Sequence, residues 1–272
     1  MNAADKIHVL ILAGTRPSGD PVAQAEGVSS KAFVDVDGRP MIEHVLETVR
    51  TWPLVGDIIL SMPKYEVDSN QSLLLTDMVQ RNQVKRIETG TTPCRSIMLG
   101  LEGIPTANAL LVTTADHPLL THEILNEFVD LSWKKPSDFT AAIAETDMVE
   151  KAYPQVKRTR VPLTDGAIGG CNLFMFKTPQ GHNVVRFWRK VEENRKKPIK
   201  MARTLGLGIL FRFMRKTLSR DYLVKFIEKK TDSQIGLTMM SNPHAAIDVD
   251  KKEDLALVRQ IFRDGYARKK RA

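Results

Sequence analysis

The sequence contains only two cysteines, Cys94 and Cys171, among its 272 residues. Two cysteines cannot build the multi-bridge framework on which small secreted domains depend, so a reducing compartment is the simpler interpretation. No apolar run approaches the ~20 residues that a membrane-spanning helix needs. The start of the chain is too polar for a secretory signal peptide. We therefore expect a cytoplasmic protein.

Two familiar phosphate-binding motifs are also missing. No Lys-Ser/Thr pair closes a Walker loop, and the three-glycine spacing of dinucleotide-binding proteins does not occur. The sequence has no evident internal repeat and no signature of a nucleic-acid-binding module. A hydrophobic fraction of 42% is nevertheless ordinary for a globular chain of this length, which can bury a sizeable core.

The net charge of +8 is concentrated in one segment. Residues 186–230 hold 15 Lys/Arg and four Asp/Glu, a balance of +11, so the rest of the chain carries −3. We therefore interpret residues 181–230 as a basic helical insertion within a single domain that spans residues 1–272.

Strand-like and helix-like segments alternate along the chain. Apolar runs predict strands, and apolar residues three or four apart predict helices. The alternation predicts an α/β fold with a mixed, mostly parallel sheet and right-handed crossovers. We expect strands at residues 7–12, 32–36, 57–62, 84–87, 109–116, 139–145, 173–176 and 235–240, and helices at residues 41–51, 73–83, 184–195, 199–214 and 219–230.

The first strand is followed by a long polar loop that holds Arg16 and ends at Lys31. In parallel sheets such a loop lies at the carboxyl edge, where ligands bind. Its glycines allow backbone N–H groups to approach phosphate oxygens, which the two cations can neutralise. The alternative is an ordinary surface loop with two solvated cations.

Three acidic residues stand next to predicted strands or helices in two distant parts of the chain. Asp116 follows the strand expected at residues 109–116, and Asp248 and Asp250 precede the last helical segment. Taken alone, Asp116 and Asp250 could each cap a helix, and Asp250 has Glu253 three residues later, as in a capping box. Their carboxylate oxygens are hard ligands of the kind that suits Mg²⁺, and a metal-binding role depends on the resemblance to a family that uses acids at these positions.

The loop after the first strand resembles the opening signature of nucleotidyltransferases with the sugar-nucleotide fold. The resemblance rests on Leu12-Ala13-Gly14, Arg16, Lys31 and residues 36–42 (Val-Asp-Gly-Arg-Pro-Met-Ile). The molybdenum-cofactor-type transferases and the cytidylyltransferases are the most similar branches. The chain departs from the pattern at Thr15, where a glycine is usual, at Ser30, where a proline is usual, and in a longer loop.

Later segments extend the resemblance. Residues 90–101 are similar to the stretch by which cytidylyltransferases hold base and ribose, and this places Arg95 and Ser96 at a helix N-terminus, which Ser96 could cap. Asp116 matches the family's metal-binding acid. Residues 245–255 are similar to the family's closing motif, in which Asp250 matches the second metal ligand best and Asp248 comes next.

The resemblance implies a three-layer Rossmann-like fold and a Mg²⁺-dependent transfer of a nucleotide. A phosphorylated small-molecule acceptor would attack a nucleoside triphosphate, CTP in first place and GTP in second, with release of pyrophosphate. The roles that the resemblance implies are nucleotide binding by Leu12, Ala13, Gly14, Arg16, Lys31, Arg95, Ser96 and Asp116, catalysis by Arg16 and Lys31, metal binding by Asp116, Asp250 and Asp248, and acceptor binding by Arg160, Gly170 and Asn172.

Two other classes remain open. A glycosyltransferase of the same fold would need an Asp-x-Asp motif after the middle strand, where this chain has Asp116-His117-Pro118. A non-catalytic protein that interacts with a membrane surface would not need both metal-binding acids and Lys31.

The basic insertion allows three interpretations. Its apolar side could pack on the protein body or on a second subunit in a homodimer. It could instead lie on an anionic membrane surface, at the inner face of the membrane. Nucleic acid is the least favoured partner, because the cations lack interleaved aromatic residues.

Overall fold

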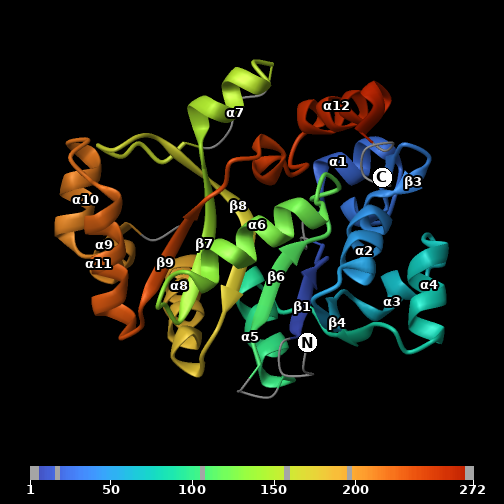
Figure 1. The fold of residues 1–272 in the computed structure, drawn as a ribbon, viewed down its shortest axis with the longest axis horizontal. Helices are drawn as coiled ribbons and strands as arrows, with labels where there is room; N and C mark the ends of the chain where they lie inside the picture. Colours follow the sequence, from blue (N-terminus) through green and yellow to red (C-terminus); the bar gives the residue numbers. More distant parts are fainter. Residues whose placement is uncertain (1–5, 16–18, 105–107, 156–159, 195–197, 267–272) are drawn as a thin grey trace.

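The computed structural model describes residues 6–15, 19–104, 108–155, 160–194 and 198–266. A seven-stranded sheet lies at its centre, with helices on both faces (Figure 1). The strand order is β5-β4-β1-β6-β8-β7-β9, and β8 alone runs antiparallel to its neighbours. The expected α/β fold with a mixed, mostly parallel sheet is confirmed.

The sheet strands lie close to the expected positions. They are β1 (Ile7–Leu12), β4 (Val55–Ser61), β5 (Lys85–Ile87), β6 (Leu110–Thr114), β7 (Phe139–Glu145), β8 (Ile168–Phe176) and β9 (Ile235–Met239). The helices are α1 (Pro21–Glu26), α2 (Met41–Thr51), α3 (Lys64–Val67), α4 (Leu73–Gln80), α5 (Pro93–Glu102), α6 (His122–Trp133), α7 (Thr146–Ala152), α8 (His182–Asn194), α9 (Pro198–Leu205), α10 (Leu207–Met214), α11 (Arg220–Thr231) and α12 (Lys252–Ile261).

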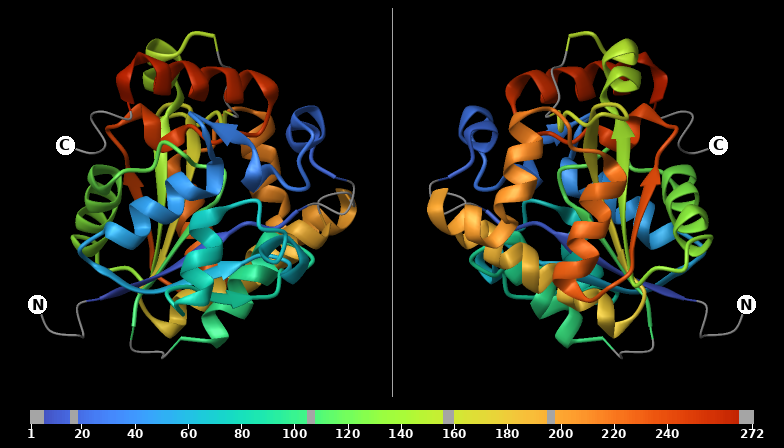
Figure 2. Two further views of the ribbon diagram at one scale, coloured as in Figure 1. Left: turned by 90° about the vertical axis from the view of Figure 1, so that its right-hand side faces the viewer. Right: turned by 90° about the vertical axis from the view of Figure 1, so that its left-hand side faces the viewer.

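The two faces of the sheet bury separate apolar layers. Alternate residues of β1 point to opposite sides, as in any strand. Val9 and Ile11 pack with the layer that includes α2, α4, α6 and α12, and Leu10 packs with the layer beneath α5 and α8. The views from both ends show the resulting three layers (Figure 2). Burial on both faces explains why β1 is a continuous apolar run.

The basic segment forms α8 to α11, between β8 and β9. Val184 and Val185 of α8 belong to the apolar layer under the sheet, so this helix is part of the core. Helices α9, α10 and α11 form the left-hand end of the molecule in Figure 1. The single helix expected at residues 199–214 is wrong. It breaks at Gly206, whose φ of 76° lies in the left-handed region that glycine adopts at little cost.

The strand expected at residues 32–36 is also largely wrong. Lys31–Phe33 is a 3-10 helix, and only Asp35–Val36 (β2) is extended, paired with Arg39–Pro40 (β3). The side chain of Ser30 caps the 3-10 helix by accepting a hydrogen bond from the backbone N–H of Ala32. An apolar run alone does not distinguish a buried strand from a buried short helix.

Hydrogen bonds between main chains join the segments at the carboxyl edge of the sheet. Ala115 N–H donates to Leu12 O at 2.9 Å, and Val249 N–H donates to Asp116 O at 2.9 Å. The ends of β1 and β6 and the segment before α12 are thereby held side by side. Within the residues described, the helices are all too short or too polar to span a bilayer.

Candidate active site

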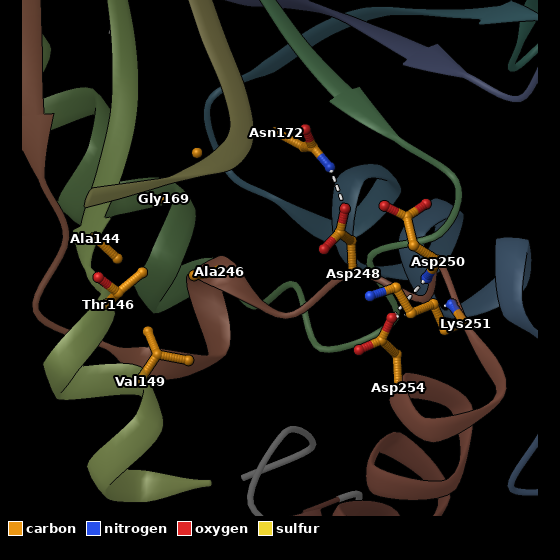
Figure 3. A pocket seen from close by; sticks show the side chains of 11 residues that line it. Ala144, Thr146, Val149, Gly169, Asn172, Ala246, Asp248, Asp250, Lys251 and Asp254 are labelled. Carbon is orange, nitrogen blue, oxygen red and sulfur yellow. Dashed lines mark hydrogen bonds between the residues drawn. The ribbon is translucent and has the colours of Figure 1, made fainter. Parts of the chain in front are cut away.

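Three carboxylates meet at the carboxyl edge of the sheet. Asp116, Asp248 and Asp250 each offer an oxygen, and these oxygens lie within 4.8 Å of one another. Asp116 follows β6, whereas the other two precede α12, so residues more than 130 positions apart share one site. Asp248 and Asp250 lie side by side in Figure 3. The family resemblance implied that these three acids share one site, and the structure brings them together.

The ammonium group of Lys31 lies between two of these acids. Its Nζ is 2.5 Å from Asp116 Oδ2 and 3.0 Å from Asp250 Oδ1. The Lys31 side chain is only 17% exposed. Burial by itself would lower its pKa, but the charges and hydrogen bonds of the two carboxylates outweigh burial and raise the pKa well above the ordinary value. Lys31 is therefore charged at physiological pH.

Buried Asp254 fixes the backbone beneath Asp250. Its Oδ2 accepts hydrogen bonds from the N–H groups of Asp250, at 3.1 Å, and Lys251, at 3.0 Å. The interpretation of Asp250 as the cap of α12 is wrong, because the N-cap residue is Lys251 and the acid that reaches back to its N–H is Asp254. The carboxylate of Asp250 faces Lys31.

Asn172 holds the third acid. Its Nδ2 donates to Asp248 Oδ2 at 2.7 Å (Figure 3). Asn172 has a φ of 49°, in the left-handed region, and lies where the pairing of β8 with β7 shifts register. Such an irregularity re-aims a strand side chain, and Asn tolerates this conformation better than most residues.

A pocket of about 240 Å³ adjoins the acids (Figure 3). Its lining comes from β7, α7, β8 and the segment that leads into α12. The lining residues are Ala144, Thr146, Val149, Gly169, Gly170, Asn172, Ala246, Asp248, Asp250, Lys251 and Asp254. Gly170 and Asn172, which were expected to bind the acceptor, both line this pocket. Gly169 and Gly170 belong to β8, which begins five residues before the strand expected at residues 173–176.

Arg160 does not line this pocket. Its guanidinium pairs with two acids of α7, at 2.5 Å from Asp147 Oδ1 and 3.1 Å from Glu150 Oε2. Its charge is thereby largely compensated within the protein. The neighbouring cations Lys157 and Arg158 lie outside the described residues.

The described residues include only part of the signature in the loop after β1. Leu12 ends β1, Ala13 is buried, and Gly14 is exposed at the edge of the sheet, where a ligand can approach the main chain. A Cβ at Gly14 would lie 3.2 Å from Thr89 Cγ2, so there is little space for a side chain at this position. Arg16 lies outside the described residues.

The two departures from the family signature contact each other. Thr15 Oγ1 donates to the buried carboxylate of Glu66 at 2.5 Å and lies 3.1 Å from Ser30 Oγ. Thr15 and Ser30 thus replace the usual glycine and proline with a hydrogen-bonded pair. This pair lies next to Lys31 and joins the two ends of the long loop.

The helix α5 begins differently from the sequence-based expectation. Thr92 is its N-cap, because its side chain accepts from Arg95 N–H, and Pro93 occupies the first helical position. Buried Ser96 therefore does not cap the helix. Its Oγ accepts from Gly90 N–H at 2.9 Å and holds the loop after β5. Arg95 is exposed on the same helix.

Several site residues were missed from the sequence. Thr146 and Lys251 line the pocket, and Asp254 supports Asp250. Thr146 carried no sequence signal. The signal for Lys251 was only the Lys251-Lys252 pair, which stands where the family has Thr-Pro. Asp254 could have been found, because an acid three residues after an N-cap is the capping-box position.

The acids fit a divalent cation of the Mg²⁺ type. Asp116 Oδ1 is buried and has no hydrogen-bond partner within the described part of the chain. A buried carboxylate oxygen without a donor is costly unless a cation satisfies it. Carboxylate oxygens are also the ligands that Mg²⁺ prefers. Asp116, Asp248 and Asp250 could therefore hold such an ion.

Comparisons with known proteins agree with this geometry. Residues 9–190 match the family model described as a MobA-like NTP transferase domain. A 2-C-methyl-D-erythritol 4-phosphate cytidylyltransferase of Haemophilus influenzae is 30% identical over 142 residues, which cover 49% of this chain and 60% of that protein. The chain therefore spans less than two thirds of the length of this relative.

Solved structures share the fold. A hypothetical transferase of Thermus thermophilus has a TM-score of 0.74 at 24% identity, over 92% of this chain and 99% of the other. The 4-diphosphocytidyl-2C-methyl-D-erythritol synthase of Anaerococcus prevotii has a TM-score of 0.59 at 13% identity, over 97% and 100%. The family match covers two thirds of the sequence and includes both Lys31 and Asp116. The chain belongs to the MobA-like NTP transferase family.

Proposed function

We propose that the protein is a Mg²⁺-dependent nucleotidyltransferase. It transfers a nucleoside monophosphate from a nucleoside triphosphate to a phosphorylated small molecule and releases pyrophosphate. The observation that carries this proposal is the meeting of Lys31, Asp116, Asp248 and Asp250 at the carboxyl edge of the sheet. Ligands of open α/β sheets bind at this edge.

In this reaction an acceptor phosphate oxygen bonds to the α-phosphorus of the triphosphate. The bond from that phosphorus to the bridging oxygen breaks, and pyrophosphate leaves with the electron pair. Catalysis of such a transfer depends on positioning and on neutralising charge. When bound by Asp116, Asp248 and Asp250, Mg²⁺ would withdraw charge from the phosphate oxygens.

Residues of the chain bind the phosphates and orient the metal-binding acids. Lys31 keeps its positive charge and can bind phosphate oxygens. Exposed Gly14 allows the main chain to approach the triphosphate, and Arg16 is proposed to add a second cation. Asn172 orients Asp248, and Asp254 fixes the backbone that carries Asp250.

The acceptor is proposed to bind in the pocket beside the acids. Gly170, Asn172 and Thr146 present polar groups there, and Lys251 supplies a cation suited to an anionic acceptor. Arg160 is a weaker candidate for acceptor binding than Lys251, because two acids already pair with it.

CTP is the proposed nucleotide and GTP the second choice. CTP is favoured by the stretch with Arg95 and Ser96, which resembles that of cytidylyltransferases. Relatives named as cytidylyltransferases also match the chain in sequence. Because Ser96 already binds Gly90 N–H, we assign the base contact first to the loop that Ser96 holds, and to Arg95.

Pyrophosphate release from the four nucleoside triphosphates tests the proposal, with a panel of phosphorylated sugars and alcohols, with and without Mg²⁺. We expect Lys31→Ala and Asp116→Asn each to lower kcat/KM by about 10²-fold or more with the fold intact. Asp68→Asn, an exposed acid that pairs with Lys64, is the matched control. Near-normal turnover in either site variant would refute the assignment.

A further inference from the structure

The helix α10 is apolar in sequence but is hardly buried. Its sequence is Leu-Gly-Ile-Leu-Phe-Arg-Phe-Met, and Ile209 is the one buried residue in it. Leu207 is 77% exposed and Met214 is 81% exposed, and both phenylalanines of the helix are exposed as well. Half of the large apolar side chains that are exposed in the described residues therefore lie on one helix of eight residues. Scattered surface apolar residues are normal, but a cluster of this kind marks an interaction surface.

The exposed stretch is firmly anchored at both ends. Ile209 and Leu218 are buried together against Ile143 and Ile168 of the sheet. Every residue from 211 to 217 is exposed between these anchors. The apolar side chains thus project from a fixed base at the end of the molecule formed by α9, α10 and α11 (Figure 1).

The surroundings of this stretch are uniformly basic. Residues 194–220 contain nine Lys/Arg and no Asp/Glu. The guanidinium of Arg215 lies 5.0 Å from the Phe211 ring centre, and Lys216 is exposed beside it. The acids that border the stretch are already paired, Asp165 with Arg220 at 2.7 Å and Asp221 with Lys225 at 2.9 Å. The partner must therefore be apolar and anionic together.

We infer that α10 and the basic residues after it dock the protein on an anionic phospholipid surface. Leu207, Phe211 and Met214, which share one face of the helix, would enter the headgroup region, and Arg212, Arg215 and Lys216 would lie among the lipid phosphates. A second copy of the chain fits less well, because a symmetric contact would bring two basic surfaces together. A nucleic acid would use the cations but would leave the Leu and Met side chains without a purpose.

The docking surface adjoins the proposed acceptor pocket. Ile143 and Ile168, on which α10 is anchored, directly precede the pocket residues Ala144 and Gly169. Docking would thus bring this end of the sheet close to the lipid surface. The inference itself does not depend on the proposed nucleotidyl transfer, since it rests on the exposed apolar residues of α10 and on the basic residues around them.

Co-sedimentation with vesicles tests the inference on the full chain. One set of vesicles is phosphatidylcholine alone, and the other contains about one quarter anionic phosphatidylglycerol. We expect binding to the anionic vesicles only at low to moderate salt, and weak binding to the neutral ones. The triple variant Leu207→Ser, Phe211→Ser, Met214→Ser and the double variant Arg215→Glu, Lys216→Glu should each weaken binding about tenfold or more.

The control replaces exposed apolar residues elsewhere. Leu73→Ser with Trp133→Ser changes side chains of similar exposure on α4 and α6 and should bind like the wild type. Absence of wild-type binding to anionic vesicles would overturn the inference. So would equal binding by the triple variant, or a wild-type dimer in light scattering that this variant converts to monomer. Thermal unfolding of each variant confirms that the fold is kept.

Discussion

At the scale of single residues, Asn172 combines a backbone role with a side-chain role. Its φ of 49° costs little for Asn or Gly and about 1 kcal/mol or more for Ala. Its side chain holds Asp248. We expect Asn172→Gly to keep the unfolding midpoint close to wild type and to lower kcat/KM about tenfold, because Asp248 loses its donor.

The comparison with Asn172→Ala separates the two roles. That variant should lose the same activity and also unfold at a lower urea concentration. Equal stability of the two variants would show that the left-handed conformation does not matter here. Full activity of Asn172→Gly would show that Asp248 needs no orientation by Asn172.

Lys31 should contribute to stability in a way that depends on pH. Its pKa is raised in the folded protein by Asp116 and Asp250. A raised pKa gives a stabilisation that is fully present below the unfolded-state pKa of about 10.5 and is lost as pH rises through the folded-state pKa. The difference in unfolding free energy between wild type and Lys31→Met should therefore be constant from about pH 6 to 9 and shrink above about pH 10.5.

Urea unfolding of both proteins across this pH range provides the measurement. The subtraction removes the titration of groups that both proteins share. Lys64→Met is the control, because Lys64 is exposed and pairs with Asp68, one helical turn away. A difference for Lys31→Met that already declines near pH 8 would contradict the raised pKa.

The sequence identified the charged residues of the site better than their supports. Lys31, Asp116 and Asp250 could be found because each stands in a stretch that resembles a family motif, whereas each charge alone could equally have been a solvated cation or a helix cap. Ser96 was misassigned as a cap because Thr92, four residues earlier, is an equally good cap and is followed by proline at the first helical position. Asn172 was expected to bind an acceptor, but its contact with Asp248 depends on a strand irregularity that no residue pattern announces.

At the scale of elements, the entry to α8 depends on one close approach. A Cβ on Gly181 would lie 2.5 Å from the carbonyl oxygen of Asp138, just before β7. This oxygen also accepts from Lys177 N–H, so it cannot move without cost. We expect Gly181→Ala to lower the free energy of unfolding by about 1–3 kcal/mol, measured by urea unfolding.

Gly170→Ala is the control for this prediction. A Cβ at Gly170 meets no atom within 4 Å, and the residue lies in β8 without a positive φ. Its stability should be unchanged or slightly higher. An unfolding free energy of Gly181→Ala equal to that of this control would mean that α8 can shift away from β7 without cost.

Elements were predictable where periodicity was long and were not where it was short. The helix Met41–Thr51 and the strands of the sheet followed from their apolar patterns. The strand predicted at residues 32–36 was wrong because Ala32, Phe33 and Val34 are all buried. Such an unbroken apolar run shows no periodicity that separates a strand from a short helix. The break at Gly206 was not predicted, because apolar residues continue on both sides of the glycine.

At the scale of the whole molecule, the order of the strands in the sheet could not be predicted from the sequence. Alternating strands and helices predict a mostly parallel sheet but not that β8 runs against its neighbours between β6 and β7. Only the family resemblance led us to expect that Asp116 and Asp250 meet. The folded chain brings them together through main-chain bonds such as Val249 N–H to Asp116 O, which no local pattern encodes.

Because the proposed metal site is built from residues far apart in the sequence, metal binding should stabilise the folded state. Asp116 lies more than 130 residues before Asp248 and Asp250, so the three oxygens come within 4.8 Å of one another only in the native state. An ion that binds the native state alone stabilises it by about 2.7 kcal/mol at 100 times its dissociation constant. For a chain of this size, that corresponds to a rise in Tm of a few degrees. We therefore expect millimolar Mg²⁺ to raise the Tm of the wild type, in the absence of nucleotide.

Asp116→Asn distinguishes a specific site from general screening of charge. This variant removes one carboxylate charge from the cluster but keeps the size of the side chain, so it should lose most of the Mg²⁺-dependent shift in Tm. Asp57→Asn, which changes an exposed acid beside His8, should keep the full shift. An equal rise in all three proteins would mean that Mg²⁺ acts through ionic strength, and the three acids would then have to be explained by their contacts with Lys31 and Asn172 alone.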